Sequence, residues 1–315
     1  MEITYEEIKT IFKMELNREL LEISPCGNHD LNRNLVFFTA DKDNKWVIKF
    51  FYKPNKRIRE IKSFQYFKQD RLTILAEGIT KLGHEWLIYP FVEGDLLDLK
   101  IDKIPTENLI QLFEEIGAIL GCFHGSHTFD YFGDWNVEKR SPVGEYRNFI
   151  IEDTERLIGN LQSCTSEESN IYQKAIYHVR EEYKNIRQLE VGRLCHRDID
   201  GRNIMITQNS ENFYGVSAFL DFEKCVVFNE FYDITGLYRK YFLSNPYLIK
   251  PFKRGYEWYL KIEESFNSEI KFNLLRLGID LCSWSKDVSK LFYCESFNYL
   301  KMVLINYDQI DRWYL

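Results

Sequence analysis

The chain has 315 residues, enough for two lobes with a substantial buried core. Its formal net charge of -7 argues against a protein that binds a nucleic acid polymer, because such proteins must neutralise phosphates. Seven widely spaced cysteines without a Cys-x-x-Cys pair indicate neither a disulfide scaffold nor a zinc ribbon. No apolar run reaches the roughly 20 residues of a membrane span, and the N-terminus lacks a signal-peptide pattern. We therefore expect a cytoplasmic protein without a membrane partner.

The N-terminal part of the chain combines helical patterns with short β-rich runs. Thr4 and Glu7 have the spacing of a capping box at the start of a helix. Two β-rich runs separated by a polar stretch predict a hairpin, and further short runs add strands to it. The expected elements are a helix at 4–20, strands at 35–39 and 46–51 around a turn at 41–44, a helix at 57–68, and strands near 74–76 and 86–89.

Beyond about residue 92 helical periodicity dominates. Two short strand-like runs, 203–207 and 216–220, interrupt it and are separated by a polar loop. The second part is therefore predicted to be mainly helical. The expected helices cover 107–123, 146–161, 167–189, 231–242 and much of the chain after 251.

The residues that suggest chemistry flank these two strand-like runs. Asp198 and Asn203 lie five residues apart on a loop that enters the first run, and Asp221 directly follows the second. Phosphoryl transfer needs a group that accepts a proton from the attacking hydroxyl, and oxygen ligands that hold a metal ion against the phosphates. An Asp, an Asn and a second Asp brought together by a hairpin supply these parts.

His196-x-Asp198-x-x-x-x-Asn203 resembles the catalytic loop of the aminoglycoside phosphotransferase and choline kinase group, relatives of the protein kinases. The resemblance implies an α+β, bilobal, protein-kinase-like fold, with a small N-terminal antiparallel-sheet lobe at 1–92 and a larger, mainly helical lobe at 93–315. It also implies that Asp198 is the catalytic base and that Asn203 and Asp221 are ligands of Mg²⁺. His196 would then orient the loop and not act as a base itself.

The resemblance extends to a lysine and a glutamate in the N-terminal part. The strand that contains Lys49 looks like the one whose lysine pairs with the phosphates of the nucleotide. Glu60, eleven residues later on a predicted helix, is placed to pair with Lys49. A buried ammonium group beside phosphates needs such a carboxylate to hold it in position.

Two further segments are expected to contact the nucleotide. The turn that contains Gly27 and Asn32 would cover the phosphates of ATP or GTP with backbone N–H groups, with an ordinary hairpin turn as the alternative. The segment with Tyr89, Pro90 and Phe91 resembles the family's hinge, whose backbone groups would bind the base.

Several residues favour a small-molecule acceptor over a protein. No Ala-Pro-Glu segment or long activation loop follows Asp221, and Asp200 replaces the lysine that is usual in serine/threonine protein kinases. The family's loop often reads His-Gly-Asp-x-His-x-Gly-Asn. Arg197, Asp200 and Arg202 depart from that pattern, so the subfamily stays open.

The sequence thus predicts a magnesium-dependent kinase that transfers the γ-phosphate of ATP or GTP to a hydroxyl of a small, amine-bearing molecule, as a monomer or weak dimer. An aminoglycoside is the first choice of acceptor, with antibiotic resistance as the corresponding role. The alternatives are a choline, ethanolamine, sugar or amino-alcohol kinase, or a non-catalytic kinase-like protein of the spore-coat type. The preference for an amine rests on acidic residues among the C-terminal aromatic ones: Glu257, Glu263, Glu264, Asp280, Asp287 and Glu295.

Overall fold

The computed structural model describes residues 3–27, 34–210 and 212–313. The chain divides into two compact units, unit 1 with Met1–Asp102 and Gly201–Cys225, and unit 2 with Lys103–Asp200 and Val226–Leu315. This grouping differs from the lobes proposed at 1–92 and 93–315, because residues 201–225 pack with the N-terminal part. Met205 and Ala218, for example, belong to the same buried apolar cluster as Tyr89. The lobe boundary itself stays a prediction.

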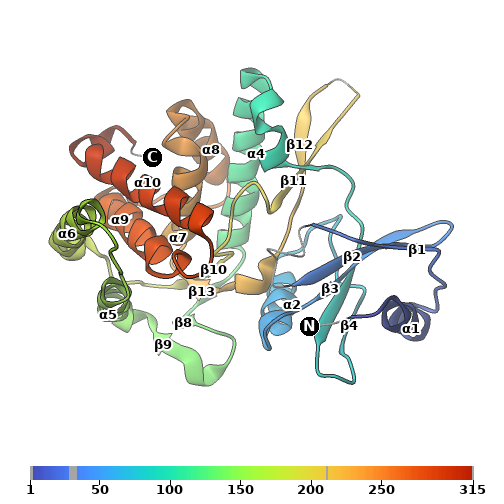
Figure 1. Ribbon diagram of the computed structural model, residues 1–315. Helices are drawn as coiled ribbons and strands as arrows, with labels where there is room; N and C mark the ends of the chain where they lie inside the picture. The colour runs from blue at the N-terminus through green and yellow to red at the C-terminus, as the bar shows by residue number, and fades with distance from the viewer. Residues whose placement is uncertain (1–2, 28–33, 211, 314–315) are drawn as a thin grey trace. The chain divides into compact units, whose positions relative to one another are not determined.

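Unit 1 contains a five-stranded antiparallel sheet and two longer helices (Figure 1). The strand order is β1-β2-β3-β5-β4, and β2 and β3 form the predicted hairpin. The elements are α1 (Tyr5–Leu16), β1 (Glu22–Pro25), β2 (Leu35–Ala40), β3 (Lys45–Phe50), α2 (Lys56–Tyr66), β4 (Ala76–Ile79) and β5 (Glu85–Pro90).

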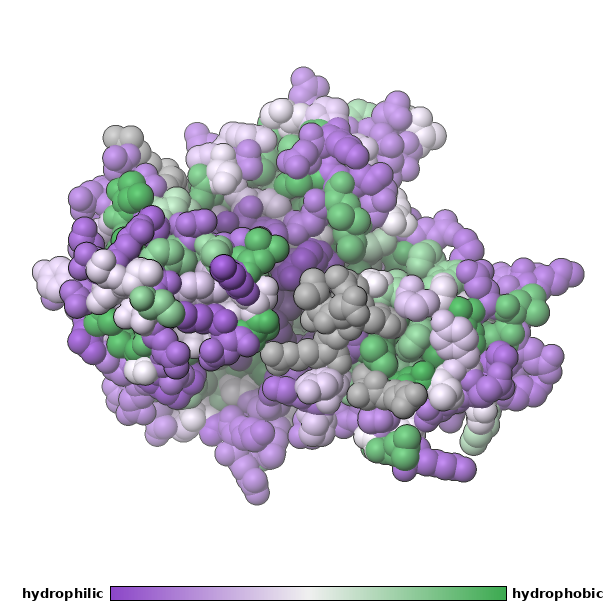
Figure 2. Space-filling view, viewed as in Figure 1, coloured by the Kyte–Doolittle hydropathy of each residue, from purple (hydrophilic) through white to green (hydrophobic). Residues whose placement is uncertain are grey.

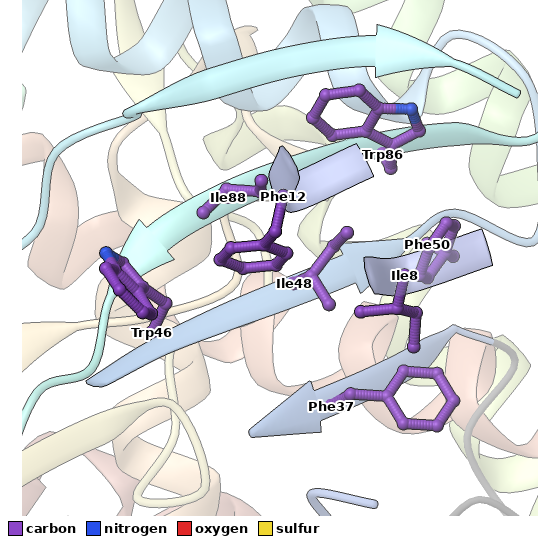
Figure 3. Packing of buried hydrophobic residues seen from close by; sticks show 8 residues of the cluster. All are labelled: Ile8, Phe12, Phe37, Trp46, Ile48, Phe50, Trp86 and Ile88. Atoms are coloured by element: carbon purple, nitrogen blue, oxygen red, sulfur yellow. The ribbon is translucent and has the colours of Figure 1, made fainter. Parts of the chain in front are cut away.

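Alternation along β3 separates the two faces of this sheet. Trp46, Ile48 and Phe50 pack with Ile8 and Phe12 of α1 in one buried cluster (Figure 3). The residues between them point to the opposite face, because successive side chains of a strand alternate. That opposite face carries a second apolar cluster of Phe51, Leu72, Leu87, Tyr89, Val92, Met205 and Ala218, with Ile61 and Phe64 of α2 packed against it.

Helix α1 begins as predicted and ends earlier. The Thr4 hydroxyl accepts the Glu7 N–H at 3.2 Å, which satisfies one of the free donors of the first turn. Asn17 adopts a left-handed conformation with φ 51°, so the helix stops at Leu16 and not near residue 20.

A second, three-stranded sheet of unit 1 has the order β12-β11-β6. It consists of β6 (Asp95–Leu96), β11 (Ile204–Gln208) and β12 (Tyr214–Phe219), followed by the short 3₁₀ turn η5 (Phe222–Lys224). Gly94 precedes β6 with φ 141°, and a Cβ there would overlap the carbonyl oxygen of Ile206, so only glycine fits. The two strand-like runs predicted around Asn203 and Asp221 are thus confirmed as an antiparallel pair.

Unit 2 is mainly helical, as predicted, and its longest helices form much of its core. The predicted run at 231–242 is an α-helix that continues as one π-helical segment. The helices of unit 2 are α4 (Thr106–Gly125), α5 (Tyr146–Gly159), α6 (Ser166–Glu181), α7 (Phe231–Leu237), the π segment η6 (Tyr238–Phe242), α8 (Ile249–Tyr256), α9 (Ser265–Ser285) and α10 (Lys290–Ile305). The short helix α3 (Leu97–Lys100) belongs to unit 1.

Unit 2 also contains a small antiparallel sheet that the sequence did not predict. Its order is β7-β10-β13-β8-β9, with strands β7 (Thr128–Phe129), β8 (Tyr131–Gly133), β9 (Arg140–Pro142), β10 (Gly192–Cys195) and β13 (Val226–Phe228). Strands of two to four residues are too short to establish a period of two.

Hydrophilic residues cover most of the face shown in Figure 2, with apolar residues scattered between them. No helix among the residues that the structure describes is long and apolar enough to cross a membrane.

Candidate active site

Lys49 lies at the centre of a group of carboxylates in unit 1. Its Nζ is 2.9 Å from Glu60 Oε2 and 2.5 Å from Asp221 Oδ1, and Glu223 lies 3.5 Å away. The Lys49 side chain is 8% exposed and that of Glu60 only 3%. The predicted pair of Lys49 and Glu60 is therefore present and buried, and Asp221 joins it.

Local structure explains this arrangement. Lys49 is one of the β3 residues that alternation directs away from α1, towards the face on which α2 packs. Glu60 lies on α2, in the second turn after the helix begins at Lys56, and is buried. The strand and the helix are joined by a short connection, so a lysine and a glutamate eleven residues apart can meet.

The electrostatics keep Lys49 charged. Burial on its own would lower the pKa of Lys49, but the carboxylates around it, Asp221 first, raise it above its ordinary value. Burial raises the pKa of Glu60 above its ordinary value, although Lys49 opposes that shift. The result is a buried ammonium group whose partners are fixed by two different elements, α2 and the segment after β12.

Asp221 and Asn203 lie at adjacent ends of β12 and β11. Ile204 pairs with Phe219, and the Leu220 N–H donates to the Asn203 carbonyl at 2.8 Å. Asp221 itself adopts a left-handed conformation with φ 63°. The hairpin therefore brings together the two residues that the sequence assigned to a metal, with an amide and a carboxylate as oxygen donors.

Phe222 anchors the segment that carries Asp221. Its ring is buried, and its centroid lies 5.4 Å from that of Phe64 in the last turn of α2. The centroid of Phe67, which directly follows α2, is 6.3 Å away. An apolar residue after Asp221 thus fixes the position of the carboxylate against α2.

Glu223 is a charged residue of this group whose position the sequence did not determine. Its carboxylate accepts the side-chain amide of Asn34 and lies 3.8 Å from Lys56 Nζ. Asn34 in turn accepts the Tyr52 N–H at 3.1 Å. The Asp-x-Glu spacing of 221 and 223 was the available signal, because a 3₁₀ turn places both carboxylates near the same lysine.

The expected nucleotide contacts of the hinge and the N-terminal turn are described in part. Tyr89 is buried, and burial raises its pKa well above the ordinary value. β5 extends to Pro90, and the Phe91 N–H donates to the Lys45 carbonyl at 3.0 Å, so this N–H is already engaged. Gly27 follows β1 with φ 79°. Asn32 lies outside the described residues, and the roles of all these residues stay predictions.

Asp198 belongs to unit 2, on the loop that follows β10. Asp233 at the start of α7 holds this loop: its carboxylate accepts the N–H groups of His196 at 2.6 Å and of Arg197 at 2.7 Å. Arg197 has φ 63°, and its guanidinium lies over the rings of Phe228 and Tyr232. The backbone immediately before Asp198 is thus fixed by a buried carboxylate.

Two more buried side chains orient Asp233. His124 Nε2 lies 3.0 Å from Asp233 Oδ2, and the other ring nitrogen lies 2.7 Å from the Tyr256 hydroxyl. Burial on its own would raise the pKa of Asp233, but the hydrogen bond with His124, the nearby His196 and the Arg197 N–H hold it below its ordinary value. His124 and Asp233 lie close enough to Cys195 to resemble a metal-ligand set. Their existing hydrogen bonds instead indicate a structural role for His124 and Asp233.

Two of the acidic residues considered for amine recognition already have basic neighbours. Glu263 forms an ion pair with Arg187 at 2.5 Å, and Glu257 lies 4.0 Å from Lys253. Both carboxylates therefore already have a basic partner within unit 2.

Arg187 also contacts a buried carboxyl of α9: Glu269 Oε1 accepts the backbone N–H of Arg187 at 2.7 Å. Burial raises the pKa of Glu269 from its ordinary 4.5 to about 7. Between these two values the folded chain keeps a proton that the unfolded chain has lost, so stability falls as pH rises. We expect a loss of about 3 kcal/mol across this window.

Urea unfolding measured from pH 4 to 8 tests this expectation, with Glu269→Gln as the comparison. The variant keeps an oxygen acceptor for Arg187 and cannot ionise, so the stability difference between variant and wild type is expected to grow in its favour as pH rises. A pH-independent difference would contradict the raised pKa.

The chain has an α+β fold in two units, and in unit 1 the side chains of Lys49, Glu60 and Asp221 meet beside the β11–β12 hairpin. This combination is typical of kinase-like phosphotransferases. A family model described as the phosphotransferase enzyme family APH matches residues 27–265. The chain belongs to this family. No curated protein sequence matches the chain.

Solved structures agree on the fold. Aminoglycoside phosphotransferase APH(4)-Ia superposes with a TM-score of 0.73 at 12% identity, covering 96% of this chain and 99% of its own. Spectinomycin phosphotransferase APH(9)-Ia, solved with ADP and spectinomycin, has a TM-score of 0.66 at 12% identity and full coverage of both chains. Aminoglycoside 2'-phosphotransferase-IIIa, solved with GDP, has a TM-score of 0.68 at 12% identity, covering 97% of this chain and 100% of its own. The predicted kinase-like α+β fold is confirmed.

Proposed function

We propose that this phosphotransferase uses magnesium and ATP or GTP to phosphorylate a hydroxyl of a small, amine-bearing molecule, with aminoglycosides as the first acceptor class to test. The observation that carries the proposal is the buried Lys49, paired with Glu60 and Asp221 in unit 1. A lysine fixed in this way presents a permanent positive charge, which suits the phosphates of a nucleotide.

The donor set fits magnesium. The Asn203 amide and the Asp221 carboxylate supply the oxygen ligands that this ion prefers, and they lie at adjacent ends of one hairpin. When bound, the ion would neutralise charge on the phosphates. Asp221 also bonds to Lys49, so its carboxylate connects the proposed phosphate-binding lysine with the proposed magnesium ligands.

Asp198 is the proposed base. Asp233 holds the loop by accepting the N–H groups of His196 and Arg197, which fixes the backbone from which the Asp198 side chain extends. A carboxylate held in this way would orient the acceptor hydroxyl and take its proton as the phosphoryl group is transferred.

Aminoglycosides come first because the structural neighbours include enzymes solved with ADP and spectinomycin, or with AMP-PNP and hygromycin B. At 11–12% identity these neighbours support the fold alone, so choline, ethanolamine, sugars and amino alcohols belong in the same panel. ATP and GTP are both tested, since the neighbours were solved with adenine and guanine nucleotides.

The experiment measures magnesium-dependent phosphoryl transfer from ATP and from GTP across this panel, for wild type and Asp198→Ala. We expect transfer to at least one amine-bearing acceptor and a loss of at least a hundredfold in the variant, because general base catalysis typically contributes about 10²–10⁴-fold. Transfer that survives the substitution would contradict the role of Asp198. Nucleotide binding without transfer to any acceptor would favour the non-catalytic, kinase-like alternative.

A further inference from the structure

Gln69 bonds to the backbone of β12 with both polar atoms of its side-chain amide. Its Nε2 donates to the Phe219 carbonyl at 2.9 Å, and its Oε1 accepts the Phe219 N–H at 2.7 Å. β12 is an outer strand of its sheet and pairs with β11 on its other side. The Gln69 amide therefore makes, at a single residue, the two hydrogen bonds that a further strand would make.

The backbone of Gln69 is itself held by a tight turn. Gln69 and Leu72 form an isolated antiparallel bridge, and the Leu72 N–H donates to the Gln69 carbonyl. Leu72 is buried in the same apolar cluster as Leu87 and Tyr89 of β5. The side chain of Gln69 thus extends from a turn that is anchored in the core of unit 1.

The hydrogen bonds at the end of β12 alternate in direction. Phe219 bonds outward to Gln69, and Leu220 bonds inward to the Asn203 carbonyl at 2.8 Å. Asp221 follows in a left-handed conformation. The two residues before Asp221 are therefore held on opposite sides, Phe219 by the Gln69 amide and Leu220 by the backbone of Asn203.

We infer that Gln69 is a positioning residue for Asp221, acting through the backbone of Phe219. This inference rests on the proposed function, in which Asp221 and Asn203 hold the divalent ion. Magnesium requires near-octahedral oxygen ligands at about 2 Å, so a small displacement of one carboxylate weakens binding. Without the Gln69 amide, Phe219 loses both outward hydrogen bonds. The Leu220 hydrogen bond, the packing of Phe222 and the Lys49 ion pair then hold the segment that carries Asp221 without this support.

The test uses Mn²⁺ as a paramagnetic substitute for magnesium and ADP as the nucleotide, with the full chain. Free Mn²⁺ is followed by electron paramagnetic resonance, which gives the affinity of the ion for the ADP complex. ADP affinity is measured separately in EDTA. Gln69→Met keeps the length of the side chain and removes both hydrogen bonds. Gln69→Glu keeps an acceptor for the Phe219 N–H and sets a carboxylate oxygen against the Phe219 carbonyl.

We expect Mn²⁺ affinity to fall about tenfold in Gln69→Met, which is the low end of the effect of residues that orient metal ligands. In Gln69→Glu, Mn²⁺ affinity should fall by at least the same factor. ADP affinity in EDTA should stay within about twofold, because Lys49 and Glu60 are unchanged. A general loss of structure would instead weaken both.

Gln65→Met is the matched control. Gln65 is an exposed residue of α2 that accepts a hydrogen bond from Lys62, so the same chemical change there should leave both affinities unaltered. Wild-type Mn²⁺ affinity in both Gln69 variants would overturn the inference and leave the proposed function standing. A wild-type chain that binds no Mn²⁺ with ADP would overturn the proposed function and the inference together.

Discussion

Replacing Lys49 with methionine is expected to lower the free energy of unfolding by about 3 kcal/mol or more, because it leaves the buried Glu60 without its cation. The Glu60 side chain is 3% exposed, so water cannot compensate for the lost ammonium group. Asp221 and Glu223 lose the same partner, although at 33% and 14% exposure they remain partly hydrated. Urea unfolding of the purified chain measures the loss.

The loss should depend on pH. Burial already raises the pKa of Glu60, and removal of Lys49 takes away the charge that opposes this shift. A carboxyl with a raised folded-state pKa destabilises the fold as pH rises, so Lys49→Met should recover stability as pH falls and Glu60 takes up a proton.

A double variant separates the ion pair from other effects of the lysine. Lys49→Met combined with Glu60→Leu replaces the buried pair by apolar side chains, and should recover most of the stability lost in the single variant. Lys9→Met on α1 is the control, since Lys9 pairs with Glu6 at the surface and should contribute less than about 1 kcal/mol. A double variant as unstable as Lys49→Met would contradict the assigned role of Glu60.

The pair of Lys49 and Glu60 was predictable because it depends on local patterns. The alternation of β3 decides which face Lys49 occupies, and the helical pattern of α2 places Glu60 towards that face. The involvement of Asp221 was not predictable at this level, since it lies 172 residues from Lys49 in the chain. Its spacing from Asn203 indicated only that a strand pair would bring those two residues together.

The anchoring of Asp198 shows where sequence patterns become insufficient. The hydrogen bonds of Asp233 to the N–H groups of His196 and Arg197 depend on how α7 packs against β10, which no local sequence pattern indicates. β10 has four residues and β13 has three. Over so few residues, the sequence pattern of a strand cannot be distinguished from that of a helix. Contacts between such short elements are decided by tertiary packing.

Gly255→Ala is expected to destabilise the fold by about 3 kcal/mol or more, through a steric conflict between two helices. A Cβ at Gly255 in α8 would overlap the carbonyl oxygen of Glu114 in α4 and lie 2.7 Å from its carbonyl carbon. A Cβ at Gly117 or Gly121 of α4 would likewise overlap a backbone carbonyl oxygen of α8. All these neighbours are backbone atoms, so no side chain can rotate away and the helices must separate.

Separation of α4 and α8 should also disturb the loop that carries Asp198, the proposed base. His124 near the end of α4 and Tyr256 at the end of α8 form the hydrogen bond at 2.7 Å that orients Asp233. Stretching this connection loosens the backbone before Asp198, while Lys49 and Glu60 in unit 1 are untouched. We therefore expect Gly255→Ala to lower turnover by more than tenfold and to leave nucleotide affinity within about twofold.

Gly159→Ala provides the matched control for this steric argument. Gly159 is the last residue of α5, and a Cβ there meets no atom within 4 Å. Because alanine favours the helix over glycine by up to about 1 kcal/mol, this variant should be as stable as the wild type or slightly more stable. Thermal and urea unfolding of both variants make the comparison. Equal stability of Gly255→Ala and Gly159→Ala would show that α4 and α8 can separate without loss of stability. The close packing of the two helix backbones would then not account for the position of Asp233.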